Sequence, residues 1–409
     1  MSSFCYLPSV PEIEEQASRV QAAISQPLAP AKIADALAVV LERWRDRAFV
    51  RRRETIARVS RRLGFSVALL DESLDALLAP FTREALNHLA GRIVTRCELL
   101  GFVMAGNVAG AGLHEVAIAL LGGAGLIIKT ASREPFFFDE FARTLAEENP
   151  AIGGRVSVLN WSRDNDDLVA ALRADADLIV AYGDDATISR LGGSTGLIGF
   201  GSRLSGAVVT RSALLKPDAS EIARNLARDV TLFEQLGCLS PHHVFVESDR
   251  ESDMIRFAGS LAAAMRALAD RLPPSSDLEL EDAAALRSVR EIARWRAIAG
   301  DPLEIIEGPG LSWAVIVDRD ARFTASPGLR CVNVSMFRDS ADLCARLAPA
   351  AGRLEAFAIA GDGEEAASLR AVLGNAGVSY LAAPGAMQSP PLTWRHGGGA
   401  FLDRMTARR

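Results

Sequence analysis

Cysteine is scarce in this sequence, and its five copies are widely separated. Their number is odd, and no Cys-x-x-Cys pair occurs among them. This pattern argues against a disulfide framework and against a cysteine-ligated zinc site. We therefore expect reduced thiols and no metal centre. The five residues are Cys5, Cys97, Cys238, Cys331 and Cys344.

A long apolar run and a strong cluster of one charge are also missing. The most apolar stretch, residues 113–128, is interrupted by His114, Glu115 and three glycines, whereas a membrane-spanning helix needs about 20 consecutive apolar residues. The first ten residues lack the basic and apolar parts of a signal peptide. The basic residues are scattered, apart from a run at 51–53 that is interpreted as a solvated helix face, and the net charge is −6. We therefore expect a cytoplasmic protein with no membrane span and no nucleic-acid partner.

Hydrophobic residues make up 49% of the 409 residues, which is enough for a large core and for two or three domains. Up to about residue 99, apolar side chains recur at three- and four-residue spacing, which predicts helices. Short apolar runs then alternate with helical stretches, which predicts βαβ units and parallel sheets. The chain is therefore predicted to form two consecutive α/β lobes. The expected strands are 100–105, 126–129, 156–160, 178–182 and 197–200, then 244–247, 313–317, 331–336, 356–360 and 380–383.

A glycine-rich segment, residues 104–112, follows the first expected strand and enters a helix. Glycines at such a turn let a ligand approach the backbone, and the helix N-terminus favours anions. Asn107 within it is a candidate to donate a hydrogen bond to an oxyanion. The alternative is that Asn107 caps the following helix.

Two other strand ends carry polar residues. Lys129 ends an apolar strand, where a buried ammonium is costly and where ligands of parallel sheets bind. It is interpreted as a contact to ribose hydroxyls or to phosphate, with snorkelling to solvent as the alternative. Gly183 and Asp184 follow another strand, and an Asp in this position is commonly a helix cap.

Cys238 has a setting that the other cysteines lack. It lies on a predicted turn between Gly237 and Pro241, with His242 and His243 close behind. A cysteine on a turn with polar neighbours is a better nucleophile than a buried thiol. The alternative is an inert structural cysteine.

Taken in order, these motifs resemble the aldehyde dehydrogenase superfamily, and more closely its acyl-CoA reductase (LuxC-type) family. The similarity begins near residue 95, and its most specific part is the segment Gln235-Leu-Gly-Cys-Leu-Ser-Pro241. The resemblance implies an α/β, aldehyde dehydrogenase-like fold with a Rossmann-like cofactor lobe and a catalytic lobe. The matching stretches are 106–108, 126–130, 181–184, 200–205, 234–242, 385–388 and 394–397.

The same resemblance implies four segments. A mostly helical region (1–99) would pack on the cofactor domain. A Rossmann-like NADP-binding domain (100–206) would precede a catalytic domain with the nucleophilic cysteine (207–383). A tail (384–409) would contribute to a homo-oligomer.

The family's chemistry implies a role for each catalytic candidate. Cys238 would attack an acyl-CoA or a carrier-bound acyl thioester, and the Asn107 side chain with the Cys238 backbone N–H would hold the oxyanion. NADPH would reduce the acyl-enzyme, and free aldehyde would leave. His242 is a candidate for proton transfer, because its imidazole titrates near neutral pH and lies close in sequence to the thiol. The alternative is a structural histidine.

The cofactor residues are implied in the same way. Lys129 would bind the adenosine ribose. Ser132 stands where NAD-preferring relatives often carry an acid, which leaves room for the 2′-phosphate of NADPH. Gly183 and Asp184 would lie near the pyrophosphate, although Asp184 replaces a serine usually found there.

One departure favours reduction over hydrolysis. Oxidising aldehyde dehydrogenases carry a Glu-Leu-Gly-Gly element whose glutamate activates water, and the matching stretch here is Arg203-Leu-Ser-Gly206. Without that base an acyl-enzyme should resist hydrolysis. The superfamily's Glu-x-Phe-Gly-Pro element has only a loose counterpart at 304–309. The alternatives are an acyl-thioester relay subunit that works with an acyl-protein synthetase, and an acyl-phosphate reductase.

Overall fold

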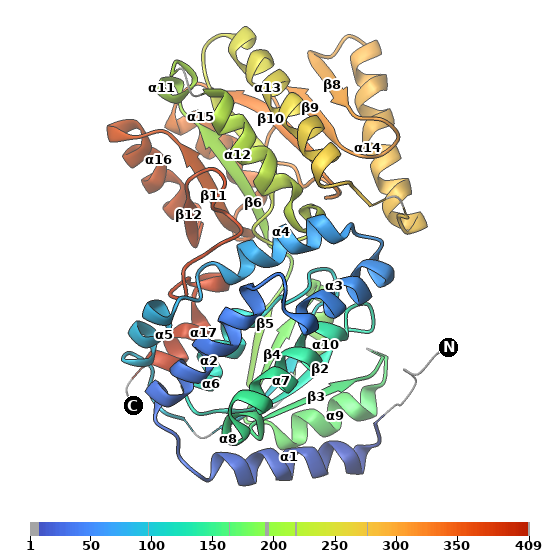
Figure 1. Ribbon diagram of the computed structural model, residues 1–409. Helices are drawn as coiled ribbons and strands as arrows, with labels where there is room; N and C mark the ends of the chain where they lie inside the picture. Colours follow the sequence, from blue (N-terminus) through green and yellow to red (C-terminus); the bar gives the residue numbers. More distant parts are fainter. Residues whose placement is uncertain are drawn as a thin grey trace. The chain divides into compact units, whose positions relative to one another are not determined.

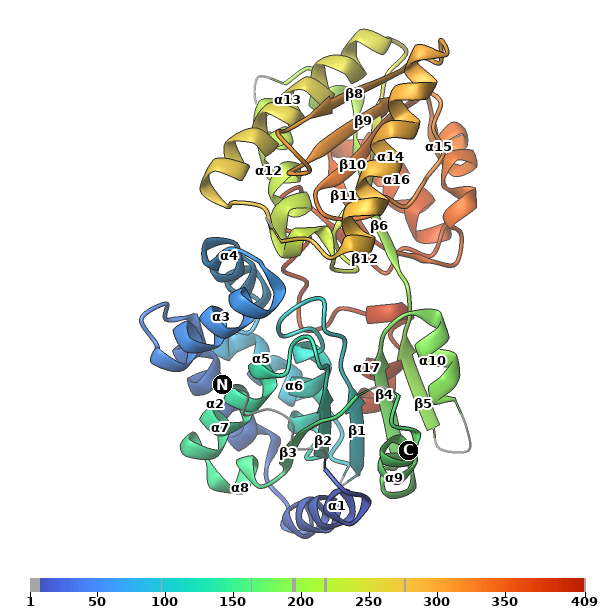
Figure 2. The ribbon, with the colours of Figure 1, turned by 90° about the vertical axis from the view of Figure 1, so that its right-hand side faces the viewer.

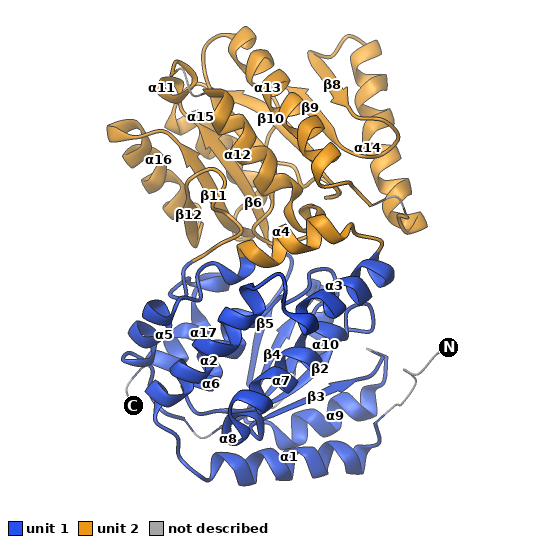
Figure 3. Ribbon diagram, viewed as in Figure 1, with its two compact units in different colours: residues 1–63, 77–202, 391–409 blue, residues 64–76, 203–390 orange. Residues whose placement is uncertain are grey.

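The computed structural model describes residues 8–96, 98–162, 164–192, 196–216, 219–275 and 277–407. The chain forms two compact units, each assembled from non-consecutive segments (Figure 3). Unit 1 contains residues 1–63, 77–202 and 391–409, and unit 2 contains residues 64–76 and 203–390. The segments predicted from the sequence are consecutive instead, and the roles assigned to them stay predictions.

A five-stranded parallel sheet forms the centre of unit 1 (Figures 1 and 2). Its strand order is β3-β2-β1-β4-β5, and β1, β2 and β4 are buried along their whole length. Burial on both faces explains why these strands are almost continuously apolar. All five strands predicted for this lobe are confirmed, with small shifts at their ends. They are β1 (Leu99–Val103), β2 (Gly125–Thr130), β3 (Val156–Asn160), β4 (Leu178–Tyr182) and β5 (Gly196–Phe200).

Helices cover both faces of this sheet. On one face α1 packs against α9 and against β2. A second group consists of α2, α6 and α7, and α6 is buried along its whole length. Capping side chains explain several helix starts: Ser9 accepts the N–H of Glu12, and Asn165 accepts the N–H of Leu168. The helices are α1 (Val10–Ile24), α2 (Pro30–Arg45), α3 (Val50–Leu63), α5 (Arg83–Ala90), α6 (Leu113–Leu121), α7 (Phe136–Glu148), α8 (Pro150–Gly153), α9 (Asp166–Asp175), α10 (Asp185–Leu191), η3 (His396–Gly398) and α17 (Ala400–Thr406).

Unit 2 is built on a seven-stranded sheet in the order β12-β11-β6-β7-β10-β9-β8. All neighbours pair in parallel except the edge strand β8, which is antiparallel to β9. Five of these strands are predicted from the sequence and confirmed, whereas β6 and β8 are missed. The strands are β6 (Leu204–Val209), β7 (Pro241–Glu247), β8 (Leu303–Glu307), β9 (Ala314–Asp318), β10 (Cys331–Phe337), β11 (Leu354–Ala360) and β12 (Tyr380–Ala382).

The helices of unit 2 lie over this sheet (Figure 2). α12 packs closely against α13, and α13 contacts β9 and β10; α15 packs against α16, which contacts β11. In the described part of the chain, no helix is long and apolar enough to cross a membrane. The helices are α4 (Val67–Leu78, all but its last two residues in this unit), α11 (Arg211–Leu214), α12 (Ala219–Thr231), η1 (Leu232–Gln235), α13 (Glu251–Arg271), α14 (Leu280–Ile298), α15 (Ser340–Leu347), η2 (Ala348–Ala350) and α16 (Gly363–Asn375).

Candidate active site

The nucleophile turn, residues 232–240, connects α12 to β7 in unit 2 and carries the half-buried Cys238. Three consecutive residues before the cysteine have left-handed backbone: Phe233 (φ 56°), Glu234 (φ 52°) and Gln235 (φ 60°). Side chains other than glycine rarely adopt this conformation, and it persists only where surrounding contacts enforce it. The turn is therefore held in a specific shape by its surroundings.

A buried ion pair supplies part of that enforcement. The Glu234 carboxylate accepts two hydrogen bonds from the Arg330 guanidinium, at 2.8 and 2.7 Å, and both side chains are nearly inaccessible. A backbone hydrogen bond joins the same two segments, because the N–H of Leu329 donates to the Glu234 carbonyl at 2.8 Å. Gln235 adds two bonds from Nε2, to the carbonyls of Pro241 (2.7 Å) and Cys331 (2.9 Å). The turn is thus tied to the ends of β7 and β10.

The peptide groups around the cysteine are also fixed. The Ser205 hydroxyl donates to the Cys238 carbonyl at 2.6 Å, and its oxygen accepts the N–H of Ala356 at 3.0 Å. On the other side, the Gln388 amide donates to the Ser240 hydroxyl at 3.1 Å. Because these bonds hold the Cys238 carbonyl and the Ser240 side chain, Cys238 stands in a preorganised turn before β7.

The other described cysteines have different settings. Cys331 is buried in β10, and burial raises the pKa of its thiol to about 11, so it stays protonated. Cys344 is exposed on α15. Cys5 and Cys97 lie outside the described residues. Of the cysteines that are described, Cys238 alone is on a turn at a strand end.

The surroundings of His242 favour a neutral imidazole. Its Nδ1 accepts the backbone N–H of Ser326 at 3.2 Å, so the ring carries its hydrogen on Nε2. Burial lowers the pKa of His242 to about 4. Such a ring is poorly suited to act as an imidazolium acid at neutral pH, and its role in proton transfer stays a prediction. The adjacent His243 is stacked on Phe245, and burial lowers its pKa to about 3.

A buried carboxyl group, Asp229, holds the loop that carries Gln388. Its oxygens accept the N–H groups of Gly385 (2.6 Å) and Met387 (3.2 Å), and the Gln388 amide donates to the Asp229 carbonyl. Burial raises the pKa of Asp229 to about 7. Sequence reasoning missed this residue. The available signal was an acid on the apolar face of helix 219–231, next to the buried Val230.

In unit 1, the cofactor edge consists of residues 104–112, 131–135 and 183–184, which follow the carboxyl ends of β1, β2 and β4. Gly110 (φ 78°) and Gly112 (φ 90°) are left-handed, and a Cβ on Gly112 would lie 3.1 Å from both the Met104 sulfur and the Tyr182 ring. Asn107 lies in this segment, half-buried. The cap of α6 is Gly112, so the alternative interpretation of Asn107 as its N-cap is wrong.

The other predicted cofactor residues lie in this edge or, for Lys129, in β2 just before it. Lys129 is buried, only 4% exposed, so snorkelling to solvent does not describe it. The Asp184 carboxylate accepts the N–H of Thr187 at 2.7 Å, which confirms it as a helix cap. Gly183 allows a close approach, because a Cβ there would lie 3.1 Å from the Thr187 side chain. Ser132 is exposed. The structure therefore brings the cofactor candidates and Asn107 to one edge of unit 1, whereas Cys238 and His242 belong to unit 2.

A buried polar network next to this edge was missed. The Tyr182 hydroxyl donates to one oxygen of Glu115 (2.7 Å), and His396 Nδ1 lies 2.9 Å from the other. Burial acts to raise the pKa of Glu115, but the histidine and the hydroxyl hold it at about 2. The His396 ring is stacked on Phe200 and on Trp394, with ring centroids 4.0 and 4.1 Å away. The network ties the C-terminal segment to the start of α6 and the end of β4.

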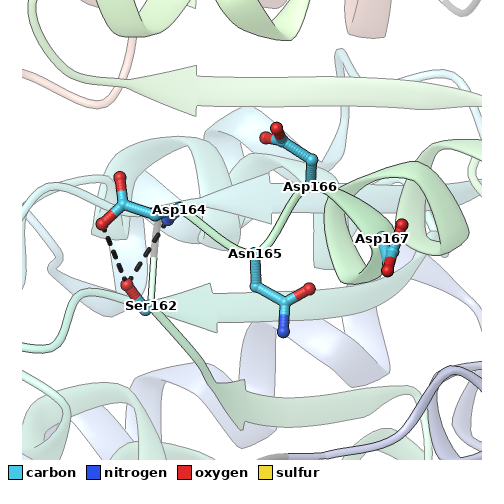
Figure 4. A pocket seen from close by; sticks show the side chains of 5 residues that line it. All are labelled: Ser162, Asp164, Asn165, Asp166 and Asp167. Carbon is cyan, nitrogen blue, oxygen red and sulfur yellow. Dashed lines mark hydrogen bonds between the residues drawn. The ribbon is translucent and has the colours of Figure 1, made fainter.

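An acidic hollow lies after β3 in unit 1 (Figure 4). Asn165 within it caps α9, and the Ser162 hydroxyl is 3.3 Å from the Asp164 carboxylate. In the described ranges, no three His, Cys, Asp or Glu side chains are arranged to hold a metal ion. The acidic hollow is lined by Ser162, Asp164, Asn165, Asp166 and Asp167.

Residues 94–408 match the family model described as acyl-CoA reductase (LuxC). The chain belongs to the LuxC acyl-CoA reductase family. The match covers both the cofactor edge and the nucleophile turn, and it confirms the family resemblance drawn from the sequence motifs. Unlike these two regions, helices α1 to α5 lie outside it.

Curated relatives of this LuxC-family chain are named long-chain acyl-protein thioester reductases. The chain is 25% identical over 336 residues to a long-chain acyl-protein thioester reductase of Aliivibrio fischeri, covering 75% of this chain and 67% of that protein. It is 27% identical over 150 residues to the enzyme of that name from Photorhabdus laumondii, covering 35% and 30%. With long-chain acyl-protein thioester reductase 2 of Photobacterium leiognathi the identity is 24%, covering 59% and 49%. The matched stretches thus span at most about two thirds of these relatives.

Solved structures similar to this LuxC-family protein establish the fold. An NAD-dependent benzaldehyde dehydrogenase from Corynebacterium glutamicum has a TM-score of 0.75 at 15% identity, covering 100% of this chain and 90% of that one. An oxidoreductase from Marinobacter aquaeolei has a TM-score of 0.73 at 14% identity, covering 95% and 86%. The predicted α/β, aldehyde dehydrogenase-like fold is confirmed.

Proposed function

We propose that this protein reduces an acyl thioester to the aldehyde, with NADPH as hydride donor and Cys238 as nucleophile. The observation that carries the proposal is the half-buried Cys238 on a preorganised turn of a LuxC-family chain. The substrate is an acyl-CoA or an acyl group on a carrier. The names of the relatives, acyl-protein thioester reductases, support the acyl-thioester class.

In the proposed reaction the Cys238 thiolate attacks the thioester carbonyl and forms a carbon–sulfur bond. As the family resemblance implies, the Asn107 side chain and the Cys238 backbone N–H would stabilise the oxyanion. The carbon–sulfur bond to CoA breaks, CoA leaves as a thiol, and an acyl-enzyme remains. Hydride addition to this acyl-enzyme gives a thiohemiacetal on Cys238. Its collapse releases the aldehyde and restores the thiolate, so one NADPH and one proton are consumed for each aldehyde.

The cofactor edge of unit 1 fits a dinucleotide. In the order β3-β2-β1-β4-β5, the chain leaves β1 toward β2 and leaves the neighbouring β4 toward β5 on the opposite side. Such a switch point is where open α/β sheets bind nucleotides. Gly110 and Gly112 allow the left-handed backbone that shapes the turn at this point. Lys129 would contact the adenosine ribose, and Gly183 would lie near the pyrophosphate. When bound, the nicotinamide supplies the hydride.

The segment 203–206 supports reduction over hydrolysis. Arg203 donates to the Gly352 carbonyl at 2.9 Å, and Ser205 bonds to the Cys238 carbonyl. Neither side chain is a carboxylate that could activate water. The acyl-enzyme is therefore expected to persist until hydride arrives. In this proposal residues 100–206 bind the cofactor and residues 207–383 carry out catalysis, while an acyl-protein synthetase partner and a homo-oligomer stay predictions.

NADPH oxidation, followed by absorbance with a panel of acyl-CoAs, tests this function. The wild type should oxidise NADPH and release aldehyde with at least one chain length, and Cys238→Ala should not. Cys344→Ala, at an exposed cysteine on α15, is the matched control and should keep full activity. An acyl adduct on Cys238 without NADPH consumption would support the acyl-relay function instead. Undiminished turnover by Cys238→Ala would refute the assignment of the nucleophile.

A further inference from the structure

The turn after β2 hides its one acidic side chain. Glu134 is 3% exposed, and its Oε1 accepts the N–H groups of Phe136 (3.0 Å) and Phe137 (2.9 Å) at the start of α7. The carboxylate is therefore used inside the fold and is not presented at the cofactor edge. Ser132, two residues earlier, is exposed and uncharged.

The exposed charged side chains at this turn are arginines. Arg62, in the last turn of α3, donates from Nη2 to the Ser132 carbonyl at 3.3 Å. Arg133 follows Ser132 directly, and all three residues are exposed. The glycine-rich segment after β1 lies against the same turn, because a Cβ on Gly106 would be 3.1 Å from the Arg133 Cβ. The Arg62 guanidinium thus lies on this turn, and the Arg133 side chain starts beside the segment proposed to receive the dinucleotide.

The chemistry of such a position is well defined. In dinucleotide-binding sheets, an acid in this region binds the 2′-hydroxyl of NAD, whereas a nearby arginine accommodates the 2′-phosphate of NADP. A guanidinium has five N–H donors in a planar fork that matches phosphate oxygens. The bond from Arg62 to the Ser132 carbonyl engages one of them. An exposed arginine held by one bond of 3.3 Å can turn toward a phosphate without breaking buried structure.

We propose that Arg62 selects NADPH by binding the 2′-phosphate, with Arg133 adding positive charge. The proposal rests on the nicotinamide chemistry proposed above and names the residue that decides its cofactor. Arg62 lies outside residues 94–408, the part of the chain that matches the family model. The helical N-terminal region, for which sequence motifs predicted no chemical role, therefore contributes to cofactor choice in this proposal.

Calorimetric titration of the full chain with adenosine 2′,5′-bisphosphate and with 5′-AMP tests this without acyl turnover. The wild type should bind the bisphosphate more tightly, and Arg62→Ala should weaken it about ten- to a hundredfold while leaving 5′-AMP within twofold. Arg62→Lys should recover part of the loss. Arg61→Ala, which removes the adjacent exposed arginine of α3, is the matched control and should behave as wild type. The ratio of kcat/KM for NADPH over NADH should fall in parallel.

The outcomes separate the two proposals. If the wild type binds both nucleotides equally, or if Arg62→Ala weakens both to the same extent, the assignment of Arg62 is wrong while the cofactor site stands. If neither nucleotide binds, the proposed cofactor site itself fails, and this inference fails with it.

Discussion

The nucleophile turn and the cofactor edge both depend on left-handed backbone, but they obtain it differently. At the cofactor edge the left-handed positions are glycines, Gly110 and Gly112, which adopt the conformation without steric strain. In the nucleophile turn they are Phe233, Glu234 and Gln235, which do not. The strain there is balanced by buried bonds, above all the ion pair to Arg330. The turn that carries Cys238 is thus supported by its own side chains, whereas the turn at the cofactor edge is shaped by glycines that leave room for neighbouring side chains.

The largest effect is expected from breaking the ion pair. Glu234→Gln should destabilise the protein by about 3–5 kcal/mol, because it leaves the Arg330 guanidinium buried without its counter-charge. Unfolding in guanidinium chloride, followed by circular dichroism, measures this. Arg395→Ala, which breaks the exposed Arg395–Asp403 pair, is the control and should change stability little. Equal effects of the two variants would show that the ion pair does not hold the turn.

The next effect concerns the pH dependence of stability through Asp229. Its pKa is about 7 in the folded protein and near 3.8 when unfolded, so between these values the folded state binds the extra proton. Stability should therefore fall as pH rises through this window, by about 2–3 kcal/mol between pH 5 and pH 8.

Asp229→Asn should remove this component of the pH dependence, because the amide does not titrate and its oxygen still accepts a hydrogen bond. Thermal unfolding at the two pH values, compared between variant and wild type, gives the difference directly. A wild-type pH dependence that the variant retains unchanged would place the titrating group elsewhere.

The smallest effect is expected from replacing a left-handed glycine of the cofactor edge. Gly112→Ala should cost about 1–3 kcal/mol, since alanine is disfavoured at φ 90° and its Cβ would crowd the Tyr182 ring. Gly300→Ala separates the two causes, because Gly300 has φ 97° but open space around it, and about 1 kcal/mol is expected there. Chemical denaturation of both variants is the measurement. A Gly300 variant that loses as much as the Gly112 variant would mean that crowding by Tyr182 contributes nothing.

Much of the fold could be predicted because buried parallel strands leave a continuous apolar signal. The five strands of unit 1 and the turn that carries Cys238 followed from such local patterns. β6 and β8 did not: β6 directly follows β5 with a glycine in its interior, and β8 is a partly exposed edge strand. Local patterns also misassigned Asn107 as a possible cap, because α6 begins several residues later than the motif indicates.

The contacts between residues far apart in the sequence could not be predicted from local patterns. Glu115 and His396 are 281 positions apart, and Arg62 and Ser132 are 70 apart. Neither pair has a periodicity or a motif that joins its members. The buried Asp229 gave only a weak signal, and the three left-handed residues before Cys238 gave none. Such features depend on tertiary packing, which propensity does not record.

Mass-spectrometric mapping of the acyl-enzyme tests the central claim most directly. The protein is mixed with an acyl-CoA in the absence of NADPH and divided into two portions. One portion is digested and mapped at once, and the other is mapped after NADPH has been added. The account predicts one acyl group on Cys238 that persists in buffer and leaves as the aldehyde once NADPH is present. An adduct on another residue, or one that hydrolyses to free acid and ignores NADPH, would contradict it.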